Sequence, residues 1–422
     1  MTISHTAEVV QIVGVFPQAE SFDSVAGISA ASIHLLAQDS TLTDVGGDSV
    51  EEAQEDDLPD VELNVAQAKQ SEERPKALPL DPRTAQSCLC DYGLTLDGLS
   101  VAPRKLICSN QMLASVDLLE TFLFLRHVNL AFNQLTDLTP LEKLHNLREL
   151  NASNNRIAKF PVGQWPSMTH LNLNNNAVAQ LRHTCMPKLL ILCLNNNQIR
   201  RLTEPETGAP YFTEENFPRL HTLQLAQNKL YLVDSTPNDP NAPNTLDIRL
   251  PRLRALFLGG NSLTSLAVYS RQVIRQNTSE LSDEKSLSDE TEPVREEIVK
   301  ERDQSALGVL PELSVLNLRC NGLHELDGLT LETVPKLQYL NLRENFIDSM
   351  GEIEKLQQLP RLQTMIFLEN PIIEMKDYRL EMRVTVPSLR RLDKDVYTEQ
   401  ENEEADLLLE QRRQEKAAAD AY

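Results

Sequence analysis

The sequence predicts an α/β solenoid, in which one short strand-and-return unit is repeated along most of the chain. Residues 168–178, MTHLNLNNNAV, show this unit: apolar residues at places one, four and six, asparagine at place nine, and an apolar residue at place eleven. Leu171 and Leu173 alternate with polar Asn172, as in a strand that buries one face. Because one unit cannot cover its own apolar face, it has to stack on copies of itself.

Nine copies follow one another, and each carries asparagine at place nine. These asparagines are Asn133, Asn155, Asn176, Asn197, Asn228, Asn261, Asn321, Asn345 and Asn370. They are 21 to 25 residues apart, except for gaps of 31, 33 and 60 residues that predict insertions. The pattern matches the leucine-rich-repeat template L-x-x-L-x-L-x-x-N-x-L. We expect a right-handed superhelix of about nine repeats, with each asparagine amide bonded to the backbone of the bend that follows its strand.

The chain is expected to have four parts. They are an acidic arm (1–85) without fixed structure, an N-terminal cap (86–124), the solenoid (125–397), and an acidic C-terminal helix (398–422). The solenoid is expected to include an insertion over 268–310 and a C-terminal cap over 373–397. An alternative for the arm is that Val9 to Phe16 and Val25 to Leu36 order on a partner.

Several local expectations follow from composition. In the N-terminal cap, Leu106, Cys108 and Met112 look like a worn half-repeat, and residues 116–124 fit a short helical return. The returns of the first repeats should hold only short 3₁₀ or α pieces, with Trp165 in the core.

Residues 203–218 and 234–250 are rich in Pro, Asn and acid, which predicts loops outside the core. The long insertion should contain a helix over 294–302, and its Ser282 and Ser288 are either phosphorylation sites or part of a solvated loop.

The charge distribution limits the classes of partner. The net charge is −22, and residues 1–100 alone hold 18 acidic and four basic side chains, so the repeat body is close to neutral. Wholesale binding of nucleic-acid phosphates is not expected, since it needs a concentrated basic face. The N-terminus has no basic, apolar leader and the chain has no long apolar run, so no secretion signal or membrane span is expected. Six cysteines without a dense framework suit a reducing compartment.

No catalytic motif is present. The sequence lacks a phosphate-binding G-x-x-x-x-G-K-[ST] loop, a G-x-S-x-G elbow and an H-E-x-x-H helix, so we expect no enzyme, cofactor or small-molecule substrate. The nearest thing to a site is the row of His127, Glu149 and His170, at place three of consecutive repeats. Histidines two strands apart are about 10 Å apart, so a solvated polar row is favoured over a zinc site.

The remaining candidate is a protein-binding surface. Places two, three, five, seven and eight of each repeat should face the concave side of the solenoid, and in the later repeats these places combine apolar and aromatic residues with arginine. Such a mixture is typical of protein-binding hot spots. The proposed contacts are Phe257, Val315, Arg319, Tyr339, Arg343, Ile366 and Leu368. The alternative is that a loop or the tail covers scattered apolar residues.

The C-terminal end carries a family resemblance. Tyr378-Arg379, Val386-Pro387, Leu389 and Leu392-Asp393 resemble the cap of short leucine-rich repeats typified by the phosphatase regulator of the SDS type. Thr398-x-x-Glu401 then predicts a capping box that opens a helix reaching about Ala419, with an apolar stripe at Leu408 and Leu409. The runs 337–371 and 378–416 are similar to a family of radial spoke leucine-rich-repeat proteins of motile cilia, as is the opening repeat at 125–147.

The resemblance implies a function without catalysis. It implies a scaffold in the radial spokes of the ciliary or flagellar axoneme, notably the third spoke, with other spoke proteins as partners and a role in motility. Two alternatives share the short repeats and the cap: a regulatory subunit of a protein phosphatase, and a spliceosomal-type partner of an RNA-binding protein.

Overall fold

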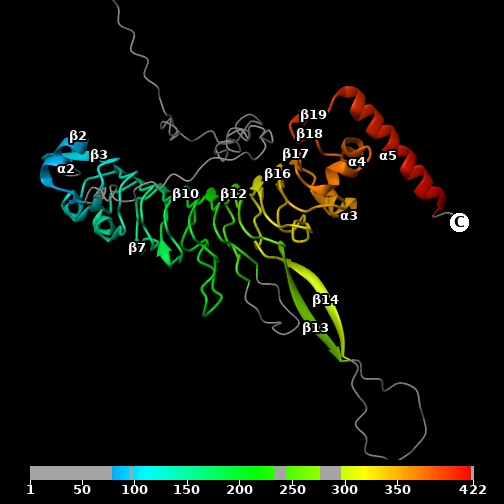
Figure 1. Cartoon of the computed structure of the whole chain (residues 1–422), viewed down its shortest axis with the longest axis horizontal. Helices are drawn as coiled ribbons and strands as arrows, with labels where there is room; N and C mark the ends of the chain where they lie inside the picture. The colour runs from blue at the N-terminus through cyan, green and yellow to red at the C-terminus, as the bar shows by residue number, and fades with distance from the viewer. Residues whose placement is uncertain (1–77, 96–97, 233–243, 276–295, 420–422) are drawn as a thin grey trace, which may run out of the picture. The chain divides into compact units, whose positions relative to one another are not determined.

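Thirteen short strands form one sheet in the part of the chain that the computed structural model describes, residues 78–95, 98–232, 244–275 and 296–419 (Figure 1). All of these residues belong to one compact unit, residues 62–422. Nine of the strands are three residues long, and each comes from one predicted repeat. They are β5 (His127–Asn129), β6 (Glu149–Asn151), β8 (His170–Asn172), β10 (Ile191–Cys193), β11 (Thr222–Gln224), β12 (Ala255–Phe257), β15 (Val315–Asn317), β16 (Tyr339–Asn341) and β17 (Thr364–Ile366). The leucine-rich-repeat solenoid predicted from the sequence is therefore confirmed.

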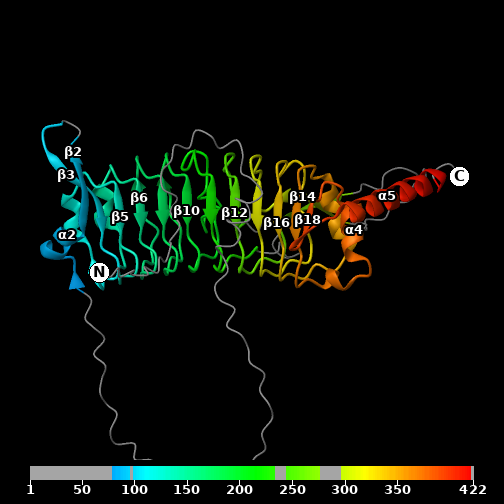
Figure 2. The same cartoon turned by 90° about the horizontal axis from the view of Figure 1, so that it is seen from above.

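The nine strands are parallel and in register, and they lie side by side along the solenoid (Figure 2). Leu171 at place four of its repeat pairs with Leu150 on one side and with Leu192 on the other. Because side chains alternate between the two faces of a strand, this register keeps every place-four residue on the same, buried face. Places three and five then lie on the opposite face, which we call the strand face.

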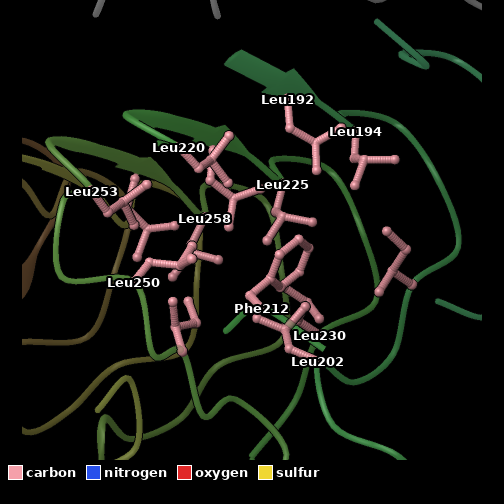
Figure 3. Close-up of a cluster of buried hydrophobic side chains, with 14 of the residues drawn as sticks. Leu192, Leu194, Leu202, Phe212, Leu220, Leu225, Leu230, Leu250, Leu253 and Leu258 are labelled. Carbon is pink, nitrogen blue, oxygen red and sulfur yellow. The ribbon is translucent and has the colours of Figure 1, made fainter. Parts of the chain in front are cut away.

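The core consists of the apolar residues at places one, four, six and eleven of successive repeats, as the close-up of Leu192, Leu194, Leu220 and Leu225 shows (Figure 3). Trp165 is also buried, as predicted. The expectation that residues 203–218 lie outside the core is wrong, because Phe212 and Phe217 are buried there with their ring centroids 5.5 Å apart. Leu246, Ile248 and Leu250 of the next insertion are buried as well. Their large apolar surfaces stabilise the longer returns.

The place-nine asparagines join neighbouring repeats through the backbone. The Nδ2 of Asn176 donates to the carbonyl of Leu173 in its own repeat and to that of Ala152 in the preceding repeat, both at 3.0 Å. Its Oδ1 accepts from the backbone N–H of Ile157, also 3.0 Å away in the preceding repeat. The predicted bond to the local bend is present, but the amide also satisfies buried backbone groups of the neighbouring repeat, which sequence reasoning did not foresee.

Place eight adopts a left-handed backbone in every repeat. The φ angles are 56° at Asn154 and Asn175, but also 58° at Phe132, 57° at Glu344 and 61° at Glu369. Asparagine tolerates this conformation better than residues such as Phe or Glu. The conformation is therefore imposed by the fold in the repeats that lack asparagine or glycine at this place.

Outside the insertions, the returns between strands are short. Two of the early ones contain the 3₁₀ helices η1 (Asp117–Thr121) and η2 (Thr139–Lys143), as expected. The returns after β6 and β8 instead contain two-residue parallel strands, β7 (Gly163–Gln164) and β9 (Thr184–Cys185), which pair with each other. Later returns contain α3 (Met350–Glu354), η3 (Lys355–Gln358) and η4 (Pro371–Glu374).

The long insertion contains an antiparallel pair of strands. β13 (Ala267–Arg275) pairs with β14 (Glu296–Ser305), with Val273 opposite Ile298. The helix expected over 294–302 is therefore wrong. β-Branched residues recur in both segments and favour extended backbone, a tendency that the charged residues between them masked in the sequence. Ser282 and Ser288 lie outside the described residues.

The N-terminal cap begins with a helix and an antiparallel hairpin. The first strand, β1 (Leu78–Pro79), pairs with β4 (Leu113–Ser115). Helix α2 (Pro82–Cys88) starts at Asp81, whose carboxylate accepts from two backbone N–H groups, and leads into β2 (Leu89–Leu94) and β3 (Val101–Ile107). Leu106 and Cys108 are buried as the half-repeat predicts, but Leu113 rather than Met112 is the third buried residue. A disulfide between Cys88 and Cys108 fastens the helix to the hairpin, a bond that the cysteine spacing did not indicate.

The C-terminal cap covers the last repeat with helix α4 (Tyr378–Thr385) and the hairpin of β18 (Arg391–Leu392) and β19 (Asp395–Val396). Between repeats, the backbone N–H at place six donates to the next strand, as Leu342 does to the carbonyl of Ile366 at 2.8 Å. At the last repeat the side chain of Asp393 takes this role and accepts from the N–H groups of Phe367 and Leu368 at 2.8 and 3.1 Å. The carboxylate therefore replaces the carbonyl of a third strand residue, because β18 pairs with β17 over two residues only.

Helix α5 (Glu399–Ala419) opens with the predicted capping box. The Glu401 carboxylate accepts from the N–H of Thr398 at 2.7 Å, and the Thr398 hydroxyl accepts from the N–H of Glu401 at 3.2 Å. Ala405 is buried, and Leu408 and Leu409 are half-buried. α5 packs against α4, where Arg412 pairs with Glu381 at 2.7 Å.

Candidate protein-binding surface

The seven predicted contact residues lie close together, on strands β12 to β17 and on the bends that follow them. Val315 and Tyr339 are register partners on β15 and β16, and Ile366 is the register partner of Asn341 on β17. Arg319, Arg343 and Leu368 occupy place seven, directly after these strands. The sequence therefore grouped these residues correctly, because equal places in neighbouring repeats are neighbours in space.

Their exposure differs from the expectation. Phe257, Val315 and Tyr339 are only 4%, 1% and 3% exposed, so the expectation of exposed apolar side chains is wrong at these three positions. Ile366, Leu368 and both arginines are half-buried. Burial raises the pKa of Tyr339 to about 12, so its hydroxyl stays neutral at physiological pH. Four of the seven residues thus have surface that a partner can reach directly.

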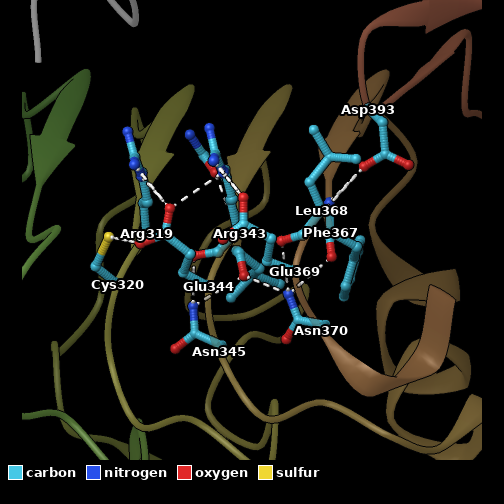
Figure 4. A network of polar contacts seen from close by, with 12 residues as sticks. Arg319, Cys320, Arg343, Glu344, Asn345, Phe367, Leu368, Glu369, Asn370 and Asp393 are labelled. Carbon is cyan, nitrogen blue, oxygen red and sulfur yellow. Dashed lines mark hydrogen bonds and ion pairs between the residues drawn. The ribbon is translucent and has the colours of Figure 1, made fainter. Parts of the chain in front are cut away.

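The two arginines belong to a network of ion pairs that crosses three repeats (Figure 4). Arg319 donates to Oε1 of Glu344 at 2.7 Å, and Nε of Arg343 lies 3.1 Å from the same oxygen. Arg343 also pairs with Glu369. Arginine at place seven of one repeat thus meets glutamate at place eight of the next. The guanidinium groups are held in a fixed orientation before any partner binds, which reduces the entropy lost on binding.

Glu344 is the centre of this network. Its other oxygen, Oε2, accepts from Sγ of Cys320 at 2.6 Å. Burial acts to raise the pKa of Glu344, but the hydrogen bonds from Cys320 and Arg319 and the charge of Arg343 outweigh it, so the pKa lies below its usual value. Burial and the bond to Glu344 raise the pKa of the Cys320 thiol to about 11, which leaves it protonated and unreactive. The arrangement is therefore an ordered network of ion pairs with an unreactive thiol beside it.

Sequence reasoning missed the acidic half of this network. Glu344 and Glu369 occupy place eight, and Arg319 and Arg343 occupy place seven. The alternation of charge between these two places in successive repeats was the available signal. It could be recognised only once place seven of one repeat was known to lie beside place eight of the next.

The polar row of His127, Glu149 and His170 is formed as the register predicts. Nδ1 of His127 lies 3.0 Å from Glu149, while Nδ1 of His170 lies 3.9 Å from it. The hydrogen bond with His127 lowers the pKa of Glu149, and burial lowers the pKa of His170. Within the described residues no group of three or more His, Cys, Asp or Glu side chains is placed to hold a metal ion.

A cleft of about 980 Å³ opens between the insertions and is bordered by Glu214, Asp247, Arg249 and Glu332. The described residues that border it also include the hydroxyl side chains of Thr213, Ser305 and Thr333, but no histidine, cysteine or lysine. Arg249 pairs with Asp247 at 2.9 Å within this cleft. In the described part of the chain no helix is long and apolar enough to cross a bilayer.

Family comparisons agree with this architecture. A family model described as leucine-rich repeat matches residues 294–421, and a second, described as leucine rich repeats (2 copies), matches residues 145–185. The described repeats therefore have the leucine-rich-repeat fold. Both models describe repeat units, which generally serve as non-catalytic scaffolds that bind other proteins, and neither describes a catalytic family.

The leucine-rich-repeat chain also has relatives that match beyond the repeat unit. It is homologous to leucine-rich repeat-containing protein 23 of Homo sapiens, at 29% identity over 78% of this chain and 78% of the relative. The Bos taurus protein of the same name is 29% identical over 76% of each chain. Among solved structures, the leucine-rich repeat domain of APL1B is similar with a TM-score of 0.44 at 19% identity, over 70% of this chain and 68% of that one.

Proposed function

We propose that the chain is a non-catalytic scaffold of the ciliary or flagellar axoneme and a structural component of the radial spokes, specifically the third spoke. The observation that carries the proposal is its homology to leucine-rich repeat-containing protein 23 over most of its length. The resemblance of residues 337–371 and 378–416 to radial spoke leucine-rich-repeat proteins supports the axonemal location. Its partners are then other spoke proteins.

The proposed mechanism is rigid presentation of a surface. The stacked repeats hold the strand face without rearrangement, since each strand is fixed by hydrogen bonds on both sides. The contact region comprises Arg319, Arg343, Ile366 and Leu368 as the residues a partner meets first, with Phe257, Val315 and Tyr339 buried beside them. Preorganised arginines flanked by apolar side chains are suited to binding another protein.

Fractionation of ciliated cells tests the location. A spoke component remains with axonemes after detergent extraction. It is released from them only by treatments that also release the spokes. A phosphatase regulator would instead be found in the detergent-soluble fraction, and a spliceosomal-type partner in the nuclear fraction. Either of these results would refute the axonemal proposal while leaving the fold unaffected.

Substitutions on the strand face test the contact region. Ile366→Glu places a charge at place five of β17, and we expect it to reduce incorporation of the protein into axonemes. The matched control is Asn151→Glu, which introduces the same charge at place five of β6, outside the region. Arg319→Glu combined with Arg343→Glu should have the larger effect, and thermal melting shows whether the variants remain folded. Equal incorporation of all variants would contradict the proposed contacts.

A further inference from the structure

The edge of the sheet at which the chain enters each strand carries an unusual concentration of basic residues. We call this the upstream edge and define it as places zero and two, on either side of the buried place-one residue, in the nine repeats and the cap turn at Leu389. Its basic members are Arg126, Arg148, Lys188, Arg219, Arg252, Arg254, Lys336, Arg361 and Arg390. Its only acidic member is Glu312. In a chain with a net charge of −22, such sorting is not expected from composition.

Backbone hydrogen bonds make this edge one continuous row. The N–H of Arg148 donates to the carbonyl of Arg126 at 2.8 Å, and the N–H of Thr169 donates to Arg148 at 2.7 Å. The same bond recurs between the place-two residues of every later repeat and ends at Arg390, which donates to Gln363 at 2.8 Å. Adjacent strands are about 4.8 Å apart, so the row is about 40 Å long.

Most of these charges have no partner among the described residues. Lys336 pairs with Glu312 at 2.5 Å, whereas the side chains of the other eight make no ion pair or hydrogen bond in the described part of the chain. Six of the eight are exposed, and Arg126 and Arg254 are half-buried. Arg319 and Arg343, on the bends after β15 and β16, behave differently, because Glu344 and Glu369 pair with them. The upstream edge therefore has unused capacity to bind negative charge.

The pKa of one histidine at this edge is lowered by the positive charge around it. His221 is at place two of its repeat, and Arg252 and Arg254 are at places zero and two of the next repeat. Burial lowers its pKa, and the charges of Arg254 and Arg252 lower it further. The positive charges of Arg252 and Arg254 therefore add up at the same point of the edge.

We propose that the upstream edge binds an acidic polypeptide segment of a partner protein, lying along the row. Carboxylates can pair with guanidinium groups in two-point contacts, and a row about 40 Å long matches roughly 12 residues of extended chain or 27 of helix. Single-stranded nucleic acid is disfavoured because its sites combine basic grooves with several aromatic platforms, and the only aromatic ring at this edge apart from His221 is that of Phe124. This inference concerns a different surface from the proposed spoke contacts and does not depend on the axonemal location.

The test measures binding of a fluorescent glutamate-rich peptide of about 20 residues to the full chain. The first variant combines Arg148→Glu, Lys188→Glu and Arg219→Glu, three exposed residues of the upstream edge. The control combines Lys159→Glu, Arg182→Glu and Arg200→Glu, three exposed basic residues elsewhere that give the same change in net charge. All six side chains lack ion pairs in the described part of the chain, so both variants should melt close to the unchanged chain.

We expect the peptide to bind the unchanged chain and the binding to weaken as salt increases. The edge variant should weaken binding by about tenfold, and the control by less than about twofold, because the contact is local. Three outcomes would overturn the proposal. They are no binding at physiological salt, equal weakening by both variants, and tighter binding of a single-stranded oligonucleotide of the same length.

Discussion

The strands β5 to β11 and the strands β12 to β16 follow one template, but the side chains around the buried leucine differ. In β5, β6, β8, β10 and β11 the residues at places three and five are half-buried, whereas in β12, β15 and β16 they are buried. Place eight differs too. It holds Asn154 and Asn175 in the first group but Glu344 in the second, where the carboxylate binds two arginines.

This difference shows which places of the repeat are free to vary. Places one, four, six, nine and eleven keep the same type of residue in both groups because they supply the core and the asparagine ladder. Places three, five, seven and eight vary without changing the backbone: place five holds Asn151 in the first group and Phe257 in the second, and place eight holds Asn154 in the first and Glu344 in the second. The same fold thus presents a polar surface early in the chain and a denser, ion-paired one later.

The largest expected effect tests whether the ladder is equivalent in both groups. Asn345→Ala and Asn155→Ala each remove an amide that bonds three carbonyls and one N–H of the backbone. Each variant should lose about 3 kcal/mol of unfolding free energy, because the N–H of Leu323 or Leu135 is left buried without its acceptor and each carbonyl loses one of its two donors. Urea unfolding measures both. A loss at only one of the two positions would break the equivalence on which the comparison rests.

A smaller loss is expected at the C-terminal end of the sheet. Asp393→Ala removes the acceptor for the N–H groups of Phe367 and Leu368 and should cost about 2 kcal/mol. Asp393→Asn retains an acceptor oxygen and should cost less. The control is Asp395→Ala in the same hairpin, whose side chain is exposed. If the alanine variants at 393 and 395 melt alike, the carboxylate of Asp393 does not stabilise the fold by replacing a strand carbonyl.

Place eight allows a stabilising substitution in the early group. Phe132 is 60% exposed and has a left-handed backbone, which asparagine adopts more readily. Phe132→Asn should therefore raise the unfolding free energy by about 1 kcal/mol. Phe346→Asn is the matched control, because Phe346 is 54% exposed but does not have a positive φ, and it stacks on His324. If the unfolding free energy rises at both positions, the effect comes from the loss of exposed apolar surface and not from the backbone conformation.

The smallest expected effect is the pH dependence of the C-terminal helix. The hydrogen bond from Arg379, together with the N–H of Thr398, lowers the pKa of Glu401 from 4.5 to about 2. A carboxyl group with a lowered pKa in the folded state stabilises the fold above its unfolded pKa, and this contribution disappears as the pH falls towards 2. Hydrogen exchange should therefore show α5 opening between pH 4.5 and 2 before the early repeats do. Glu401→Gln should abolish this pH dependence, and an unchanged profile would contradict the assignment.

Much of the fold could be predicted because the repeat is a local pattern. The spacing of Leu171, Leu173 and Asn176 defined the strand, its buried face and the ladder, and Thr398 and Glu401 predicted the start of α5. Predictions failed where neighbours distant in sequence mattered. The insertion that holds Phe212 looked like a polar loop because only two of its rings enter the core. Residues 294–302 looked helical because the strand that pairs with β14 lies more than 20 residues away.

The sequence by itself determined the period of the solenoid, the identity of its core residues and the presence of a C-terminal cap, because these depend on residues within one unit and its immediate copy. Only the tertiary structure decided which side chains lie beside one another across units. It placed Glu344 between two arginines, buried Phe257 and Tyr339, joined Cys88 to Cys108, and assembled the unpaired basic row. The physical reason is that adjacent strands are about 5 Å apart in space but 21 to 60 residues apart in the chain, so charge and burial are set by stacking.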